Sequence, residues 1–168
     1  MSNNKKIYAV IETGAGWIGL VGSSTGLSRT TLPQKTKEIA GLLLGEDIRQ
    51  MECSADYFQE LMSEYKSYFS GSRVVFSEKL DLSQSTSFER AVWETTLYIP
   101  YGETRSYSWV AGQIGKPLAS RAVGRALGKN PLPIIVPCHR VLASSGALCG
   151  FGGGLEMKRY LLDLEEKG

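Results

Sequence analysis

The first part of the chain alternates short β-prone segments with glycine-rich turns. Strands are expected at residues 6–11, 17–21 and 27–32, since each segment is short and bounded by glycine or by small polar residues. Segments joined by such short turns predict an antiparallel meander. A short helix is expected at 36–44, and Gly45 ends it.

A longer amphipathic helix is predicted next. Its apolar side chains recur at steps of one, three and four residues, which stacks them on one face. They are Tyr57, Phe58, Leu61, Met62, Tyr65, Tyr68 and Phe69. We interpret this stripe as core packing rather than a cofactor site, with Gly71 ending the helix. Residues 73–82 are read as a strand or an extended connector.

The polar segment 81–87 is the best candidate for a domain boundary. It divides the chain into an N-terminal domain, 1–84, with a supporting role, and a C-terminal domain, 85–168, which carries the chemistry. The spacing of Thr86 and Glu89 predicts a capping box that starts a helix running to about residue 98.

Two short helices are predicted at 107–114 and 118–128, joined by a turn that contains Gly115. This arrangement is typical of a helix-turn-helix, although many helical hairpins share it. A last helix is expected at 155–164. The succession of elements indicates an α+β fold, with a small strand-and-helix domain followed by a mainly helical one.

The second of these short helices has an unusual outward face. Ala119, Val123, Ala126 and Leu127 share one side, and the other side carries Arg121, Gly124, Arg125 and Gly128. Each glycine costs a helix about 1 kcal/mol relative to alanine. Either this face approaches a nucleic-acid groove closely, or Gly124 packs against a neighbouring helix and Gly128 is a cap.

The formal net charge is only +2, but the charge is unevenly distributed. No acidic residue lies between Glu103 and Glu156. That interval holds six basic residues: Arg105, Lys116, Arg121, Arg125, Lys129 and Arg140. This distribution favours a polyanionic partner, and a solvated basic face without a partner is the alternative.

Length and composition fit a compact protein with a real core, since 42% of its 168 residues are hydrophobic. The sequence shows no leader peptide and no membrane-spanning run, so we expect a cytoplasmic protein. Three cysteines without paired spacing argue for a reducing compartment. Cys53 and Cys149 are expected to be ordinary, partly buried thiols, and no metal site is expected.

The strongest candidate for chemistry is Cys138, which directly precedes the only histidine, His139. An apolar run, 134–136, leads to the thiol, and Pro133 and Pro137 restrict the backbone around it. A free thiol is mostly protonated at neutral pH, and a nearby imidazole is the usual means of activating it. A cysteine hydrolase would also need a third, orienting group, and spacing alone does not single out Glu165.

Several motifs of the second half agree in order and spacing with one family. They are Tyr101-Gly102-Glu103, Ser106-Tyr107, Ser120-Arg121-Ala122-Val123-Gly124, Asn130-Pro131, Pro137-Cys138-His139-Arg140-Val141, Ser144-Ser145-Gly146 and Gly153-Gly154-Leu155. Residues 86–166 thereby closely resemble the O6-alkylguanine-DNA alkyltransferases. The first 85 residues match only in outline.

The resemblance implies a ribonuclease H-like N-terminal domain and a winged-helix-like C-terminal domain. It also implies that the helix-turn-helix enters the minor groove of double-stranded DNA and that the damaged guanine is flipped out of the stack. Arg121 would fill the vacated place. Tyr107 would crowd the neighbouring phosphate, help to rotate the nucleotide and donate a hydrogen bond to the base.

In the active site, the resemblance implies that Cys138 accepts the alkyl group from O6 of guanine, or from O4 of thymine. His139 would act on the thiol through a water, Glu165 would orient His139, and Asn130 would tie the recognition helix to the active-site segment. The product is a thioether, which water does not hydrolyse, so one turnover per chain is expected. No cofactor is implied, and a monomer is expected.

Further residues follow from the same resemblance. DNA contacts are expected from Ser106, Ala122, Gly124, Arg125 and Lys129, and a substrate pocket from Pro133, Val136, Phe151, Gly152 and Gly153. Many members have tyrosine and serine where this chain has Phe151 and Gly152. The alternatives are a lesion-binding module without catalysis, in which relatives carry tryptophan at the position of Cys138, and a cysteine hydrolase.

Overall fold

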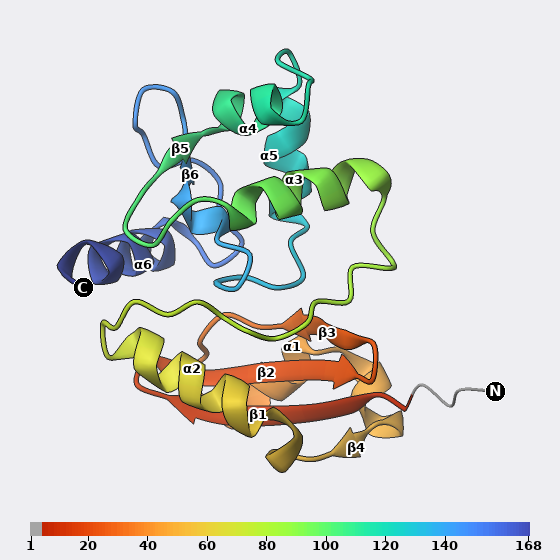
Figure 1. The fold of residues 1–168 in the computed structure, drawn as a ribbon. Helices are drawn as coiled ribbons and strands as arrows, with labels where there is room; N and C mark the ends of the chain where they lie inside the picture. The colour runs from red at the N-terminus through yellow and green to blue at the C-terminus, as the bar shows by residue number, and fades with distance from the viewer. Residues whose placement is uncertain (1–4) are drawn as a thin grey trace. The chain divides into compact units, whose positions relative to one another are not determined.

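The computed structural model describes residues 5–168. The described chain divides into two compact units that separate between Ser83 and Gln84. The first unit contains a four-stranded sheet with two helices, and the second is mainly helical (Figure 1). The expected α+β class is therefore confirmed.

The first unit is built on a sheet with strand order β3-β2-β1-β4. Strands β1 (Ile7–Thr13), β2 (Gly16–Ser23) and β3 (Gly26–Thr30) form the predicted antiparallel meander. The short β4 (Glu52–Cys53) pairs parallel to β1. The turn glycines Gly16 and Gly26 have positive φ and lie close to neighbouring backbone, which explains why the turns lack side chains there.

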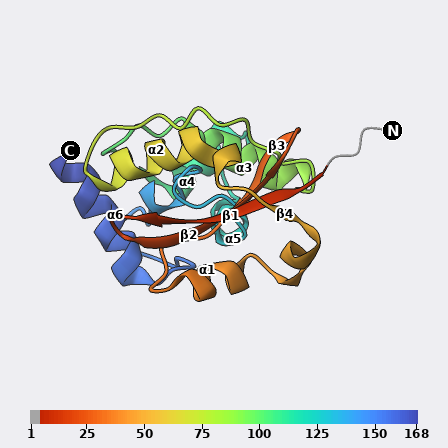
Figure 2. The ribbon, with the colours of Figure 1, turned by 90° about the horizontal axis from the view of Figure 1, so that it is seen from below.

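Helices α1 (Lys37–Leu43) and α2 (Gln59–Phe69) cover opposite faces of this sheet (Figure 2). Leu44, at the end of α1, packs so closely over Gly19 that a side chain at Gly19 would collide with it. The aromatic stripe of α2 is core, as expected, with Leu61, Tyr65, Tyr68 and Phe69 buried. One-turn 3-10 helices occupy Glu46–Gln50 and Asp56–Phe58.

One expectation for the first unit needs correction. The stripe does not begin inside the helix, because Tyr57 lies in the preceding 3-10 turn and is 42% exposed, with its hydroxyl donating to the carbonyl of Ser23 at 2.8 Å. Of the two alternatives left open for residues 73–82, the structure shows the connector, with a single bridge between Leu27 and Leu80.

The second unit contains α3 (Ser87–Leu97), α4 (Tyr107–Gln113), α5 (Ser120–Gly128) and α6 (Leu155–Lys167). Two-residue strands β5 (Arg105–Ser106) and β6 (Val141–Leu142) pair in parallel. The Thr86 capping box is confirmed, since its hydroxyl accepts from the amide of Glu89 and the Glu89 carboxylate accepts from the amide of Thr86. Ser106 caps α4 through its hydroxyl alone, which accepts from the amide of Trp109 at 3.0 Å.

Helices α4 and α5 form the helix-turn-helix and pack on α3. Val123, Ala126 and Leu127 form the buried side of α5, as their spacing predicted. The indole nitrogen of Trp93 on α3 donates to the carbonyl of Ala126 at 2.9 Å, which fixes α5 on α3.

In residues 5–168, no helix combines the length and apolar character needed to cross a membrane.

Candidate active site

The segment that precedes Cys138 is held in a tight and unusual conformation. Ile134 has φ of 76°, and no other non-glycine residue of the described chain has a positive φ. This conformation is strained for a β-branched residue, and its near-complete burial holds it in place. The amide of Leu132 donates to the side-chain oxygen of Asn130 at 2.9 Å, and the amide of Val136 donates to the carbonyl of Leu132.

Cys138 begins a 3-10 turn, Cys138–Arg140, and is 8% exposed. The side-chain nitrogen of Asn130 donates to Cys138 Sγ at 3.2 Å and to the carbonyl of Val136 at 2.9 Å. Burial raises the pKa of the Cys138 thiol. The bond from Asn130, the positive charge of Lys158 and the nearby backbone amides act in the opposite direction but do not outweigh burial. The resting nucleophile is therefore a buried, protonated thiol with donors in position for its anion.

His139, Glu165 and Arg140 form a buried cluster beneath the thiol. His139 Nε2 lies 2.7 Å from Glu165 Oε1. Arg140 Nε donates to Glu165 Oε2 at 2.9 Å, and Nη2 donates to Oε1 at 3.0 Å. Burial would raise the pKa of Glu165, but the bonds from His139 and Arg140 outweigh it and lower that pKa to about 2.

The ionised state of Glu165 determines the tautomer of His139. Burial, together with the charges of Arg140 and Lys158, lowers the pKa of His139 against the raising effect of Glu165, so the ring is neutral. An ionised carboxylate can only accept, so His139 Nε2 carries the ring proton, and Nδ1 is the basic nitrogen. The cluster thus fixes the imidazole in one orientation and leaves it able to take up a proton.

Arg140 was counted among the six cations that favour a polyanionic partner, but it does not lie on the surface. The side chain is buried, because two of its nitrogens bind Glu165 and Nη1 donates to the carbonyl of Ile99 at 2.7 Å. A buried carboxylate needs such a partner, and Arg140 neutralises it with bidentate geometry.

Lys158 on α6 is a site residue that the sequence reasoning missed. Its side chain is fully buried, and Nζ donates to the carbonyls of Val141 at 2.8 Å and Cys149 at 2.9 Å. Burial lowers the pKa of Lys158, and its charge acts on the Cys138 thiol. The available signal was the helical spacing of Lys158, Leu161 and Glu165, which together form the buried side of α6.

Tyr107, the first residue of α4, lies above this lysine. Its hydroxyl donates to the carbonyl of Cys149 at 3.3 Å, and Lys158 Nζ lies 5.8 Å from its ring centre. Burial raises the pKa of the Tyr107 hydroxyl, which therefore remains a proton donor. The ring also faces Gly124 of α5, at 3.8 Å from where a Cβ would stand, so Gly124 packs against the neighbouring helix.

The two remaining cysteines are more exposed than expected. Cys53 and Cys149 are both free and exposed, where partly buried thiols were expected. Cys53 lies on the edge strand β4, and Cys149 lies in a loop held through its backbone carbonyl rather than its side chain. Exposure of these thiols makes Cys138 the only buried cysteine of the described chain.

The other predicted residues occupy varied positions. On α5, Arg121 and Arg125 are exposed and Ala122 is half-buried. Lys129 Nζ pairs with Glu89 Oε1 at 3.1 Å, and Ser106 is occupied as the cap of α4.

The residues predicted for the substrate pocket differ in exposure. Val136 is buried and Pro133 is half-buried. The glycine-rich loop, residues 150–154, contains half-buried Phe151 and the exposed Gly152 and Gly153. A turn in which the amide of Gly154 donates to the carbonyl of Phe151 leads into α6.

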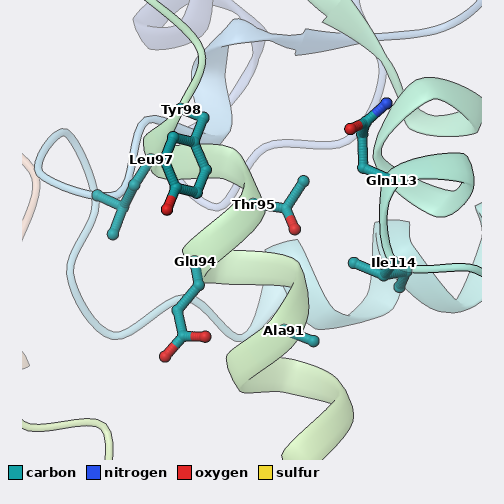
Figure 3. Close-up of a pocket in the computed structure, with 7 residues that line it drawn as sticks. All are labelled: Ala91, Glu94, Thr95, Leu97, Tyr98, Gln113 and Ile114. Carbon is teal, nitrogen blue, oxygen red and sulfur yellow. The ribbon is translucent and has the colours of Figure 1, made fainter.

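A separate open groove of about 610 Å³ lies between α3 and α4 (Figure 3). None of the predicted site residues lines this groove. Its lining consists of Ala91, Glu94, Thr95, Leu97, Tyr98, Gln113 and Ile114.

Within residues 5–168, no three metal-ligating side chains are grouped to hold an ion. The chemistry the arrangement supports is that of a thiol nucleophile with an oriented imidazole, a phenol donor and a buried cation.

Comparison with known proteins agrees with this geometry. Residues 87–167 match the model of the 6-O-methylguanine DNA methyltransferase DNA-binding domain. The methylated-DNA–protein-cysteine methyltransferase of Mycobacterium bovis is 42% identical over 95% of this chain and 92% of its own length. That of Methanosarcina barkeri is 41% identical over 95% and 96%, respectively.

Solved structures give the same result. Mycobacterium tuberculosis OGT in complex with DNA matches with a TM-score of 0.83 at 40% identity, covering 96% of this chain and 93% of that one. The O6-methylguanine-DNA methyltransferase of Pyrococcus kodakaraensis matches with a TM-score of 0.71 at 26% identity, covering 94% and 98%. This chain belongs to the methylated-DNA–protein-cysteine methyltransferase family, as its motifs indicated.

Proposed function

We propose that this chain repairs DNA directly by moving a methyl or larger alkyl group from O6 of guanine onto Cys138, once per molecule. Alkylated O4 of thymine is a second substrate of the same chemistry. One observation carries the proposal: a buried thiol accepts a hydrogen bond from Asn130 at 3.2 Å, in a family named for the methylation of cysteine.

The reaction is a direct displacement. The Cys138 thiol loses its proton to His139 Nδ1 through a water, and Glu165 holds the ring in the orientation that accepts it. Sulfur then attacks the alkyl carbon, the carbon–O6 bond breaks, and its electron pair leaves with guanine. The leaving guanine takes up one proton, which balances the proton that the thiol lost. The product thioether has no carbonyl for water to attack, which ends the reaction after one turnover.

Access to O6 requires that the nucleotide leave the duplex, because the atom lies inside the stack. The exposed cations of α5 support binding to the DNA backbone, and we assign entry into the minor groove to this helix. Arg121 takes the place of the flipped nucleotide. Tyr107 donates to the flipped base. Ser106, Ala122, Gly124, Arg125 and Lys129 complete the surface that contacts DNA.

The flipped base lies between the segment at Val136 and the glycine-rich loop. Pro133, Phe151, Gly152 and Gly153 line this pocket, where backbone groups replace the hydroxyls found in many relatives. No cofactor takes part. We place the protein in the cytoplasm as a monomer, in keeping with its unpaired thiols.

The intact mass of the chain tests the proposal. After incubation with duplex DNA containing O6-methylguanine, the chain gains one methyl group in place of one hydrogen, and the gain stops at one per chain. Cys138→Ala abolishes the gain. Cys53→Ala, which removes an exposed thiol of the other unit, leaves it unchanged.

The two alternatives give different results in the same experiment. A lesion-binding module binds the methylated duplex tightly without any change in mass. A cysteine hydrolase turns over an ester or a peptide repeatedly and leaves the methylated DNA intact. Either result overturns alkyl transfer by this chain.

A further inference from the structure

Leu118 is the most exposed large apolar side chain of the described residues, at 99%. It belongs to the turn between α4 and α5 and precedes the first residue of α5 by two positions. A single exposed leucine is common on protein surfaces and needs no special explanation. Its meaning depends on how firmly it is presented and on what surrounds it.

The turn that carries Leu118 is fixed on both sides. The amide of Lys116 donates to the carbonyl of Ala111 at 2.9 Å, and Gly115 adopts a positive φ of 71° to allow this helix end. The amide of Ala119 donates to the carbonyl of Lys116 at 2.8 Å, and the carbonyl of Ala119 accepts the first bond of α5. These hydrogen bonds fix the backbone of the turn between α4 and α5, which lies at the edge of its unit (Figure 1).

The surroundings of Leu118 are cationic. Lys116, Arg121 and Arg125 are all exposed, and none of them enters an ion pair within residues 5–168. By contrast, Arg105 and Lys129 pair with Glu103 and Glu89, respectively. Leu118 is thus an exposed apolar side chain among cations that form no ion pair. Such a surface fits a partner that presents phosphates for the cations next to apolar groups for the leucine.

We propose that Leu118 packs against the deoxyribose walls of the minor groove that α5 enters. This inference rests on the proposed function, because it continues the DNA-binding surface of Arg121 and Arg125. Duplex DNA combines both chemistries, since its phosphates attract the cations and its sugars present C–H groups in the groove. Minor-groove proteins also use apolar side chains at this groove, where they wedge between base steps; packing on the sugars needs no such unstacking. Leu118 thereby contributes affinity that does not depend on salt.

Salt dependence separates an apolar contact from a phosphate contact. We would measure binding to an unmodified duplex, so that no alkyl transfer occurs, over a range of salt concentrations. Leu118→Ala weakens binding roughly five- to tenfold at every salt concentration and leaves the slope of log K against log salt unchanged. Arg125→Ala lowers the steepness of that slope by about 0.9, as loss of one phosphate contact requires.

Two further variants complete the design. Leu42→Ala removes an exposed leucine of α1, which is 76% exposed, and leaves binding at the wild-type level. Leu118→Lys restores affinity at low salt but steepens the slope by about 0.9, because it replaces an apolar contact with a phosphate contact. In all three leucine variants, reaction with free O6-benzylguanine continues at the wild-type rate, which shows that the active site is intact.

The inference is overturned if Leu118→Ala binds the duplex as tightly as the wild type, or if its loss of affinity disappears at high salt. It is also overturned if the free-base reaction falls in parallel with binding. If the wild type bound the methylated duplex without any gain in mass, alkyl transfer would be refuted while the Leu118 comparison on the unmodified duplex stayed valid.

Discussion

At the scale of single residues, the reactivity of Cys138 depends on neighbours that favour its anion against the effect of burial. Asn130 is the closest of them, since it donates directly to Sγ. Loss of that donor should raise the thiol pKa further. Asn130→Ala is expected to shift the pH dependence of thiol alkylation by iodoacetamide upward and to slow the reaction at neutral pH.

Asn130→Asp serves as the matched variant. It keeps the oxygen that accepts from Leu132 but loses both donated bonds and adds a negative charge beside sulfur. The upward shift should therefore be larger for aspartate than for alanine. A pH profile that is the same in the wild type and both variants would remove Asn130 from activation of the thiol.

Sequence alone could assign some site residues but not others. Cys138, His139 and Asn130 lie in motifs that point to them, whereas Glu165 followed only from the family resemblance. In the structure Asn130 donates to Cys138 Sγ, and His139 lies 2.7 Å from Glu165. Arg140 and Lys158 are of residue types that usually lie on the protein surface and are rarely buried. Their burial follows from the need to neutralise a carboxylate and to bind carbonyls, which only the tertiary structure reveals.

At the scale of elements, Lys158 joins α6 to β6 and to the loop that carries Cys149. Lys158→Met keeps much of the apolar length of the side chain and removes its charge and both hydrogen bonds. We expect faster amide hydrogen exchange in residues 143–154, because the loop loses its anchor, and a higher Cys138 pKa, because the nearby charge is gone.

Lys167→Met at the exposed end of the same helix is the control. It removes an equivalent charge from α6 but anchors no loop, so both measurements should remain at wild-type values. Equal exchange in the loop for wild type and Lys158→Met would contradict the anchoring role.

Helix caps and periodicity are local signals, so the sequence predicted them well. Thr86 and Ser106 begin α3 and α4 as expected, and the buried side of α5 agrees with its spacing. The positive φ of Ile134 and the two-residue pairing of β5 with β6 have no local signal. They arise from packing of the active-site segment on the surrounding helices, which outweighs local preference.

At the scale of the whole molecule, the buried cluster makes stability depend on pH. The pKa of Glu165 falls to about 2 on folding, so its stabilising contribution is complete above its ordinary pKa and is lost as the pH falls towards 2. The pKa of buried His139 is also lowered, so acidification below its ordinary pKa of 6.5 disfavours folding as well. Both groups therefore predict lower stability in acid.

Urea unfolding followed by circular dichroism between pH 7 and pH 3 measures this dependence. Glu165 alone accounts for roughly 3 kcal/mol across its range. Glu165→Gln should lower stability at pH 7, because it leaves Arg140 buried without its anion, and should flatten the acid part of the curve. His139→Gln should flatten only the part that begins near pH 6.5. An acid dependence unchanged in both variants would refute this origin.

The alkylated chain should be less stable than the unreacted one. Cys138 is 8% exposed, so an added methyl group must enter a packed site, and the thioether is a poorer acceptor for the Asn130 donor. Overpacking of this kind costs about 1–3 kcal/mol. The whole site lies within Gln84–Gly168, so calorimetry after reaction should show a lower Tm, by about 4–8 °C for each kcal/mol in a domain of this size. Cys138→Ser carried through the same incubation should keep its Tm. An unchanged or higher Tm for the reacted wild type would mean that the site accommodates the alkyl group without strain.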